Sequence, residues 1–283
     1  MPPTKQSRTS RLWLLAAPVA ALLAASSAHA DLIQVTVTNN APTGGVGIAP
    51  LWVGFQNGTF STFTPGLAAN VAAERSAEDG NSSFLVSQFT GNAQAVLPGG
   101  PRFPGQSSSV ILNVDTANAG RYLDYFAMVV VSNDFFIGNA SPTAIDLSGL
   151  RPGQSLTLTA GVPYAAGLPN VVFDAGTEVN DFAFSLANGA FGIPGGQTGP
   201  NQGTTQNGVV TAVQGDPYAG FLNQPGGFTS GALNFNNATL YSGVATITIA
   251  NVPEPASLTL LGVGLGGLIL GRRRSGRAAS AAA

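Results

Sequence analysis

Three carboxylates lie unusually close together in the stretch FDAGTEVND, where Asp174, Glu178 and Asp181 fall within eight positions. Charged residues make up only 8% of the chain, and no Lys or Arg lies between positions 152 and 271. Crowded carboxylates repel one another unless a positive charge lies among them. Three interpretations fit these acids: a solvated turn, a catalytic pair as in glycoside hydrolases, or part of a metal site.

The residue types that are missing narrow the chemistry further. The chain contains no cysteine, and its one histidine, His29, falls in an N-terminal segment that we expect to be removed. The remainder therefore has no disulfide, no thiolate ligand and no imidazole base. This composition excludes a Ser-His-Asp triad, a histidine general base and the usual zinc sites. Carboxylate chemistry is what remains for an enzyme.

Residues 1–30 have the pattern of a secretory signal peptide. Lys5, Arg8 and Arg11 precede an apolar run at 12–25, and the segment ends in Ala-His-Ala before Asp31. That order of a basic region, an apolar region and a small-residue site predicts cleavage after Ala30 and export of the chain.

A second targeting pattern occupies residues 253–283. Its parts are the motif Pro253-Glu254-Pro255, an apolar stretch at 256–271 that predicts a short transmembrane helix, and a basic cluster at once after it. The cluster includes Arg272, Arg273 and Arg274. Together they resemble the PEP-CTERM sorting signal of Gram-negative bacteria. The resemblance implies that an exosortase processes the protein, which the C-terminal helix anchors in the inner membrane beforehand, for the cell surface or the extracellular space.

The charge balance of the chain depends on these two targeting segments. The formal net charge is −2, but seven of the eleven basic residues lie in the segments. Residues 31–252 carry four arginines against twelve acids, a net charge of −8. Nucleic acids and anionic polysaccharides bind to basic surfaces, so an acidic domain is not expected to bind them electrostatically. A divalent cation is a more suitable ligand for this acidic domain.

The central part, residues 31–252, is long enough for one sizeable domain, and its pattern favours strands. Four segments alternate apolar and polar residues, and a fifth is apolar almost throughout, which is typical of a strand covered on both faces. The segments are 32–38, 109–114, 155–159, 244–249 and 126–132. We expect a two-sheet antiparallel β-sandwich, one short helix at about 67–79 whose acids Glu74, Glu78 and Asp79 face solvent, and a long Gly/Asn/Pro-rich loop at 187–236.

Four blocks of the chain, in this order, resemble the spondin N-terminal domain family: PLWVGFQNGTF, AERSAEDGN, RYLDYFAMVVVSNDFFIGN and FDAGTEVND. The resemblance spans roughly residues 32–250. It implies a β-sandwich similar to calcium-dependent membrane-binding modules. In animals the family occurs in extracellular-matrix proteins, and bacterial versions carry sorting tails like this one.

The same resemblance implies a calcium site. Carried over by position, its ligands are Asp134 in SNDFF and Asp174 and Glu178 in DAGTE. The family's third acid is usually an aspartate, so Glu178 departs from the pattern, and Asp181 is an alternative to it. Calcium takes six to eight oxygen ligands, for which Asn133 and Asn180 are further donors.

The sequence therefore predicts an exported bacterial protein of the cell surface or extracellular matrix, of the kind found in biofilms, that is a non-enzymatic adhesion or interaction module with a calcium-binding site. Its expected partners are an exosortase, during processing, and a component of the matrix or exopolysaccharide. Two alternatives remain open. One is a carbohydrate-binding module for exopolysaccharide, and the other is a carboxylate-dependent glycoside hydrolase, which needs two acids ~5–9.5 Å apart in a cleft.

Overall fold

The protein is described by a computed structural model that covers residues 30–165, 167–180, 202–219 and 228–253. The chain divides into two units, Met1–Ala30 and Asp31–Ala283, and the description below concerns the second. The signal peptide up to His29, Asp181 and the tail from Glu254 onward lie outside the described residues.

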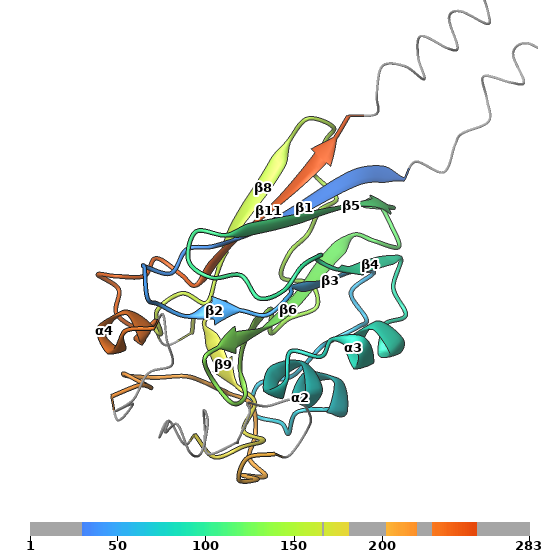
Figure 1. Cartoon of the computed structure of the whole chain (residues 1–283). Helices are drawn as coiled ribbons and strands as arrows, with labels where there is room; N and C mark the ends of the chain where they lie inside the picture. Colours follow the sequence, from blue (N-terminus) through green and yellow to red (C-terminus); the bar gives the residue numbers. More distant parts are fainter. Residues whose placement is uncertain (1–29, 166, 181–201, 220–227, 254–283) are drawn as a thin grey trace, which may run out of the picture. The chain divides into compact units, whose positions relative to one another are not determined.

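Sheet 1 has four antiparallel strands in the order β5–β1–β11–β8, as Figure 1 shows. They are β5 (Ser107–Val114), β1 (Asp31–Asn39), β11 (Ala245–Val252) and β8 (Ser155–Ala160). β1 alternates buried Ile33, Val35 and Val37 with outward-facing polar residues, because successive side chains of a strand point to opposite faces. Each such aliphatic side chain stabilises the fold by roughly 1.5–3 kcal/mol when it is buried.

Sheet 2 has seven strands, six of them in the order β10–β9–β7–β6–β3–β4, with β2 paired to β6. These are β10 (Thr211–Ala212), β9 (Val172–Asp174), β7 (Phe135–Gly138), β6 (Tyr122–Val130), β3 (Trp52–Gln56), β4 (Ala93–Val96) and β2 (Gly47–Ile48). All of its pairings are antiparallel. The predicted antiparallel β-sandwich is thereby confirmed.

Two hydrophobic clusters cover the two faces of sheet 2. The larger joins side chains of both sheets, among them Ile33 of β1 and Tyr125 of β6. The smaller lies on the other face, where Phe126 of β6 stacks on Phe136 of β7 with ring centroids 4.3 Å apart. β6 therefore contributes to both clusters, which confirms the prediction, made from its unbroken apolar run, that it is covered on both faces.

The described residues include three short helices, α2 (Val71–Glu78), α3 (Ser83–Gln88) and α4 (Ser230–Leu233), where one was predicted. The predicted helix at 67–79 is α2, which begins later because Asn70 caps it by accepting a hydrogen bond from the Ala73 amide at 2.9 Å. Beyond its end, Gly80 has a φ of +67°, which favours glycine.

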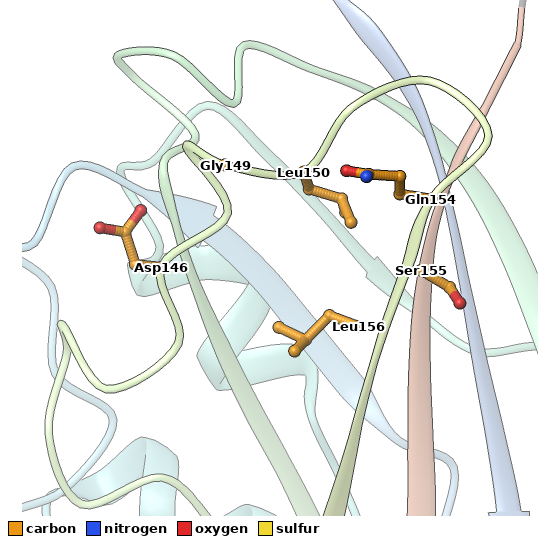
Figure 2. Close-up of a pocket in the computed structure, with 6 residues that line it drawn as sticks. All are labelled: Asp146, Gly149, Leu150, Gln154, Ser155 and Leu156. Carbon is orange, nitrogen blue, oxygen red and sulfur yellow. The ribbon is translucent and has the colours of Figure 1, made fainter.

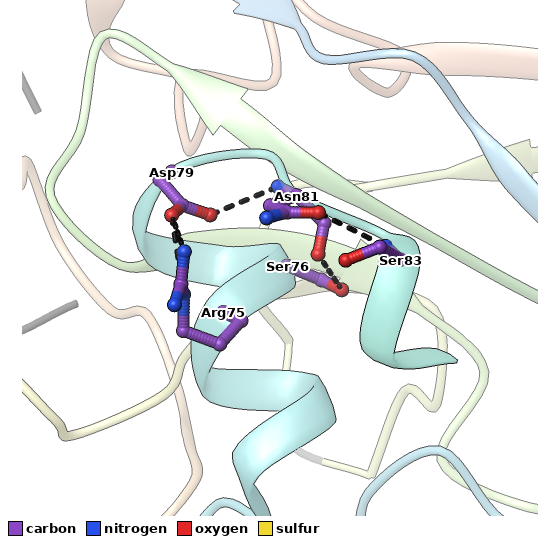
Figure 3. Close-up of polar contacts among 5 residues, drawn as sticks. All are labelled: Arg75, Ser76, Asp79, Asn81 and Ser83. Carbon is purple, nitrogen blue, oxygen red and sulfur yellow. Dashed lines mark hydrogen bonds and ion pairs between the residues drawn. The ribbon is translucent and has the colours of Figure 1, made fainter. Parts of the chain in front are cut away.

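The prediction that the acids of this helix face solvent is wrong for Glu78 and Asp79. Glu78 is 0% exposed, and the Asp79 side chain is 3% exposed because Arg75 covers it, with Nη2 2.5 Å from Oδ2 (Figure 3). Asp79 also accepts a hydrogen bond from the Asn81 amide at 3.0 Å. The physical reason is that α2 packs against both β6 and α3, so much of its surface is buried.

The five predicted strand segments correspond to β1, β5, β8, β11 and β6. Of the predicted loop at 187–236, the described part contains β10 and α4, and 187–201 and 220–227 lie outside it. No helix among the described residues is long and apolar enough to cross a membrane, and the predicted transmembrane stretch at 256–271 is not among them.

Candidate functional site

Strand pairing in sheet 2 brings Asp134 and Asp174 to the same end of two neighbouring strands. Asp134 directly precedes β7, and Asp174 is the last residue of β9. The two strands run antiparallel with Phe135 opposite Asp174. The backbone amide of Ala175 also donates to the carbonyl oxygen of Asp134 at 3.1 Å. The two acids that the sequence placed at strand ends are therefore neighbours in space.

The Asp134 carboxylate is completely buried, and its two oxygens differ. Oδ2 accepts three hydrogen bonds: from the Thr177 amide at 2.9 Å, the Thr177 hydroxyl at 3.2 Å and the Glu178 amide at 3.1 Å. Oδ1 is buried and has no hydrogen-bond partner among the residues that the structure describes. A buried carboxylate oxygen without a partner is costly, so this atom is the clearest indication of a missing ligand.

The loop after β9 is shaped around Asp174. Its Oδ1 accepts from the Gly176 amide at 2.7 Å, and its Oδ2 accepts from the side-chain amide of Asn180 at 2.7 Å. Gly176 has a φ of +68°, and a Cβ there would lie 2.6 Å from the backbone oxygen of Val209. Glycine is thus needed at this turn.

Two asparagines in the same two segments also have side-chain oxygens that are available to a cation. The side-chain amide of Asn133 donates to the Val179 carbonyl at 2.8 Å, which joins the segment before β7 to the loop after β9. The side-chain oxygens of Asn133 and Asn180 are both buried, and within the described part of the chain neither has a hydrogen-bond partner. With Asp134 Oδ1, three uncompensated oxygens therefore occur within two segments that are bonded to one another.

Glu178 is also buried, but its carboxylate bonds to a different segment of the chain. Its Oε1 accepts from the Gly203 amide at 3.0 Å. No three carboxylates among the described residues come close enough together to bind a metal ion by themselves. The described structure therefore groups Asp134 with Asp174 but does not add Glu178 to them, and Asp181 lies outside it.

Burial dominates the electrostatics of this pair. Burial and, after it, the nearby charge of Asp174 together raise the pKa of Asp134 to about 8, while the hydrogen bonds from Glu178 and Thr177 oppose the shift. Ionisation of the buried Asp134 beside the carboxylate of Asp174 is costly without a compensating positive charge. A divalent cation is the partner that this arrangement lacks.

One further acid, Asp124 of β6, has a perturbed environment that the sequence analysis did not single out. It is buried, its Oδ1 accepts from the Asn139 side chain at 2.6 Å, and its Oδ2 has no hydrogen-bond partner in the described ranges. Burial raises its pKa to about 7, against the effect of hydrogen bonds from Asn139 and Gln56. Its signal in the sequence is an acid inside an otherwise apolar strand.

Two hollows differ in what lines them. One of about 470 Å³ lies beside β8 and has a single acid, Asp146, among its lining residues (Figure 2). Arg121 pairs with that acid at 2.5 Å, so its charge is compensated. A smaller hollow of about 210 Å³ borders the loop after β9, with Glu74 and Thr177 in its wall. The smaller hollow is the one next to the buried carboxylate pair.

The aromatic residues form packing contacts rather than an exposed platform. Trp52, Phe55, Phe63, Tyr125 and Phe126 are buried, and so are Phe135 and Phe136 directly after Asp134. Phe60 and Tyr122 are partly buried. Most of these rings lie in the two hydrophobic clusters.

Comparison with known protein families identifies one region of the chain. Residues 251–274 match the PEP-CTERM protein-sorting motif, which confirms that part of the sequence-based prediction. A comparison with curated proteins finds no match. The chain thus carries the signal of an exported protein that an exosortase sorts to the cell surface or the extracellular space.

Proposed function

We propose that this protein is a non-enzymatic adhesion or interaction module of the bacterial cell surface or extracellular matrix, stabilised by a calcium ion at the Asp134–Asp174 pair. The observation that carries the calcium site is the buried Asp134 Oδ1 atom, which has no hydrogen-bond partner among the described residues, together with the charge of Asp174 that acts on Asp134.

The residues present fit a hard cation. Calcium binds carboxylate and amide oxygens, and this site offers the carboxylates of Asp134 and Asp174 together with the uncompensated amide oxygens of Asn133 and Asn180. Glu178 and Asp181 are the acids that could complete the set. A bound ion would supply two positive charges where the chain offers no basic residue between 152 and 271.

The role proposed for the ion is structural. The segment before β7 and the loop after β9 are already joined by the hydrogen bonds of Asp134 and Asn133. An ion that binds ligands from both segments would hold the two segments together more strongly, because a ligand that binds only the native state stabilises that state.

Several observations support an interaction module over an enzyme. The mature chain has no histidine or cysteine, and the Asp134 carboxylate is too deeply buried to reach a polymeric substrate. The resemblance to spondin N-terminal domains and the sorting signal both favour a role outside the cell. Matrix components, including exopolysaccharide, are the partners that we propose.

Calorimetric titration tests the calcium site. Exported protein is treated with a chelator, exchanged into clean buffer and titrated with calcium chloride. We expect saturable binding that disappears in Asp134→Asn and in Asp174→Asn. Asp216→Asn removes the same charge from an exposed position and should bind as the wild type does. Absence of heat in the wild type, or equal loss in Asp216→Asn, would contradict the site.

Adhesion is tested in cells. A strain that lacks the protein should lose attachment to, or retention in, its own matrix, and the wild-type gene should restore it. If the calcium site supports adhesion through stability, Asp134→Asn should restore attachment only partly. Full attachment without the protein would contradict the adhesive role and leave the calcium site unaffected.

A further inference from the structure

The last strand of the fold runs directly into the sorting signal. The matched signal starts at residue 251, yet Asn251 and Val252 are the final two residues of β11. Pro253, the first residue of the Pro-Glu-Pro motif, follows at once and is exposed. The domain and the motif therefore have no spacer between them.

The end of β11 around Asn251 has neighbouring backbone on both sides. On one side the Asn251 amide donates to the Gln154 carbonyl at 3.0 Å, and its carbonyl accepts from the Gly153 amide at 2.7 Å. On the other side Asn251 lies opposite Ile33 of β1. The end of β11 is thus an interior strand of sheet 1 rather than a free edge.

The Asn251 side chain adds a second set of bonds. It is 2% exposed, and its Nδ2 donates to the Leu150 carbonyl and to Asp31 Oδ1, both at 3.0 Å. The other oxygen of Asp31 accepts from the Thr116 hydroxyl. Asp31 is the residue expected to become the mature N-terminus, so the new chain end is bonded to the strand that leads into the motif.

This pairing limits where an enzyme can cut. Enzymes that cleave chains bind them as extended segments, whose backbone groups must be free to pair with the enzyme. A strand paired on both sides must first open, and cleavage within it depends on how often it does so. The bonds of Asn251 make that opening rarer at the end of β11.

We propose that the β1–β11 ladder sets the upstream limit of exosortase processing, so that the broken bond lies C-terminal to Val252 and the mature protein keeps all of β11. In that step a peptide C–N bond breaks, its acyl carbon passes to water or to an amine, and the tail leaves with a protonated amino group. Asn251 and Asp31 act as positioning residues for this limit.

The C-terminus of the processed protein tests the proposal. The full chain is expressed in a bacterium with a matching exosortase, and the C-terminal peptide of the surface or released protein is identified by mass spectrometry. We expect one C-terminus, at Val252 or later. A product that ends before Val252, or a protein that keeps its whole tail, would overturn the proposal.

Two variants test the positioning role. Asn251→Ala removes both side-chain bonds and should yield a several-fold larger fraction of products that end before Val252. Thr248→Ala changes an outward-facing residue of the same strand and should give the wild-type C-terminus. Amide exchange of the segment 245–253 should be faster in Asn251→Ala while that of β6 is unchanged. Unchanged exchange, or an unchanged C-terminus despite faster exchange, would show that Asn251 does not set the limit.

Discussion

Asp124 and Asp134 are both buried carboxylates of sheet 2, but their surroundings differ. Burial raises the pKa of Asp124 to about 7 and that of Asp134 to about 8. Amide groups of Asn139 and Gln56 donate to Asp124. Asp134 instead lies beside a second carboxylate, Asp174, and its hydrogen bonds come from Thr177 and from the Glu178 amide.

The comparison shows that burial alone does not decide what an acid does. A lone buried carboxyl group can take up a proton and become neutral. A pair of carboxylates keeps a charge when one proton binds, and a divalent cation neutralises both at once. We therefore interpret Asp124 as a structural acid and Asp134 as a cation ligand, and the four predictions below test that difference.

The largest expected effect concerns Asp124 and pH. The unfolded chain ionises this group near pH ~3.9, so the folded state binds more protons between there and pH 7, and the free energy of unfolding falls as the pH rises. At about 1.4 kcal/mol per pKa unit, the loss is on the order of 4 kcal/mol. Asp124→Asn should lose this part of the pH dependence, about two thirds of which falls between pH 5 and pH 8, while the part due to Asp134 remains. Urea unfolding with chelator at pH 5 and pH 8 measures the difference between the variant and the wild type.

The control for that measurement is Asp216→Asn, which removes the same charge from an exposed position and should keep the wild-type difference between pH 5 and pH 8. If Asp124→Asn shows the wild-type difference as well, Asp124 is not the group responsible.

Calcium gives the next largest effect and should distinguish the two acids. At a calcium concentration 100 times the dissociation constant, binding adds ~2.7 kcal/mol to the free energy of unfolding. In a domain of this size the melting temperature should rise by about 5–10 °C relative to chelator. We expect Asp134→Asn and Asp174→Asn to lose this rise and Asp124→Asn to keep it. Loss of the rise in Asp124→Asn would remove the distinction between the acids.

Protons and calcium should compete at Asp134. Because the pKa of Asp134 is about 8 without the ion, calcium must displace a proton at lower pH. Affinity should therefore fall by up to about tenfold for each pH unit below 8. Titrations at pH 6, 7 and 8 measure this slope, and Asp124→Asn should reproduce it. Equal affinity at pH 6 and pH 8 would contradict binding through Asp134.

The strands were the most predictable part of the fold. β1 and β11 alternate strictly, and alternation follows from strand geometry whatever the neighbours are. α3 was not predicted, because it is short and its N-cap, Ser82, makes no side-chain capping bond. The burial of Glu78 was also not predicted, since it depends on how α2 packs against β6 and α3.

The candidate site, like the fold, was predictable only in part from the sequence. That Asp134 and Asp174 both lie at strand ends can be read from the apolar runs before them. Their proximity depends on the pairing of β7 with β9, which joins positions about forty apart and leaves no local signal. The direction of Glu178 depends on the turn at Gly176 and on a partner at Gly203, so its carboxylate could not be placed from spacing alone.

The smallest expected effect comes from an exposed acid and has the opposite sign. Asp146 pairs with Arg121 at 2.5 Å, and the two side chains are 37% and 42% exposed. The hydrogen bond from Arg121 lowers the pKa of Asp146, so its stabilisation is present at neutral pH and begins to be lost below pH ~4. Solvent and salt screen such a pair, so Asp146→Asn should lower the melting temperature only slightly at pH 7 and less still in high salt. Melts at pH 7 and pH 3 should thus show a small loss that is smaller at pH 3, whereas Asp124→Asn should matter most above pH 7. A loss in Asp146→Asn that grows in acid would contradict the lowering of the Asp146 pKa by Arg121.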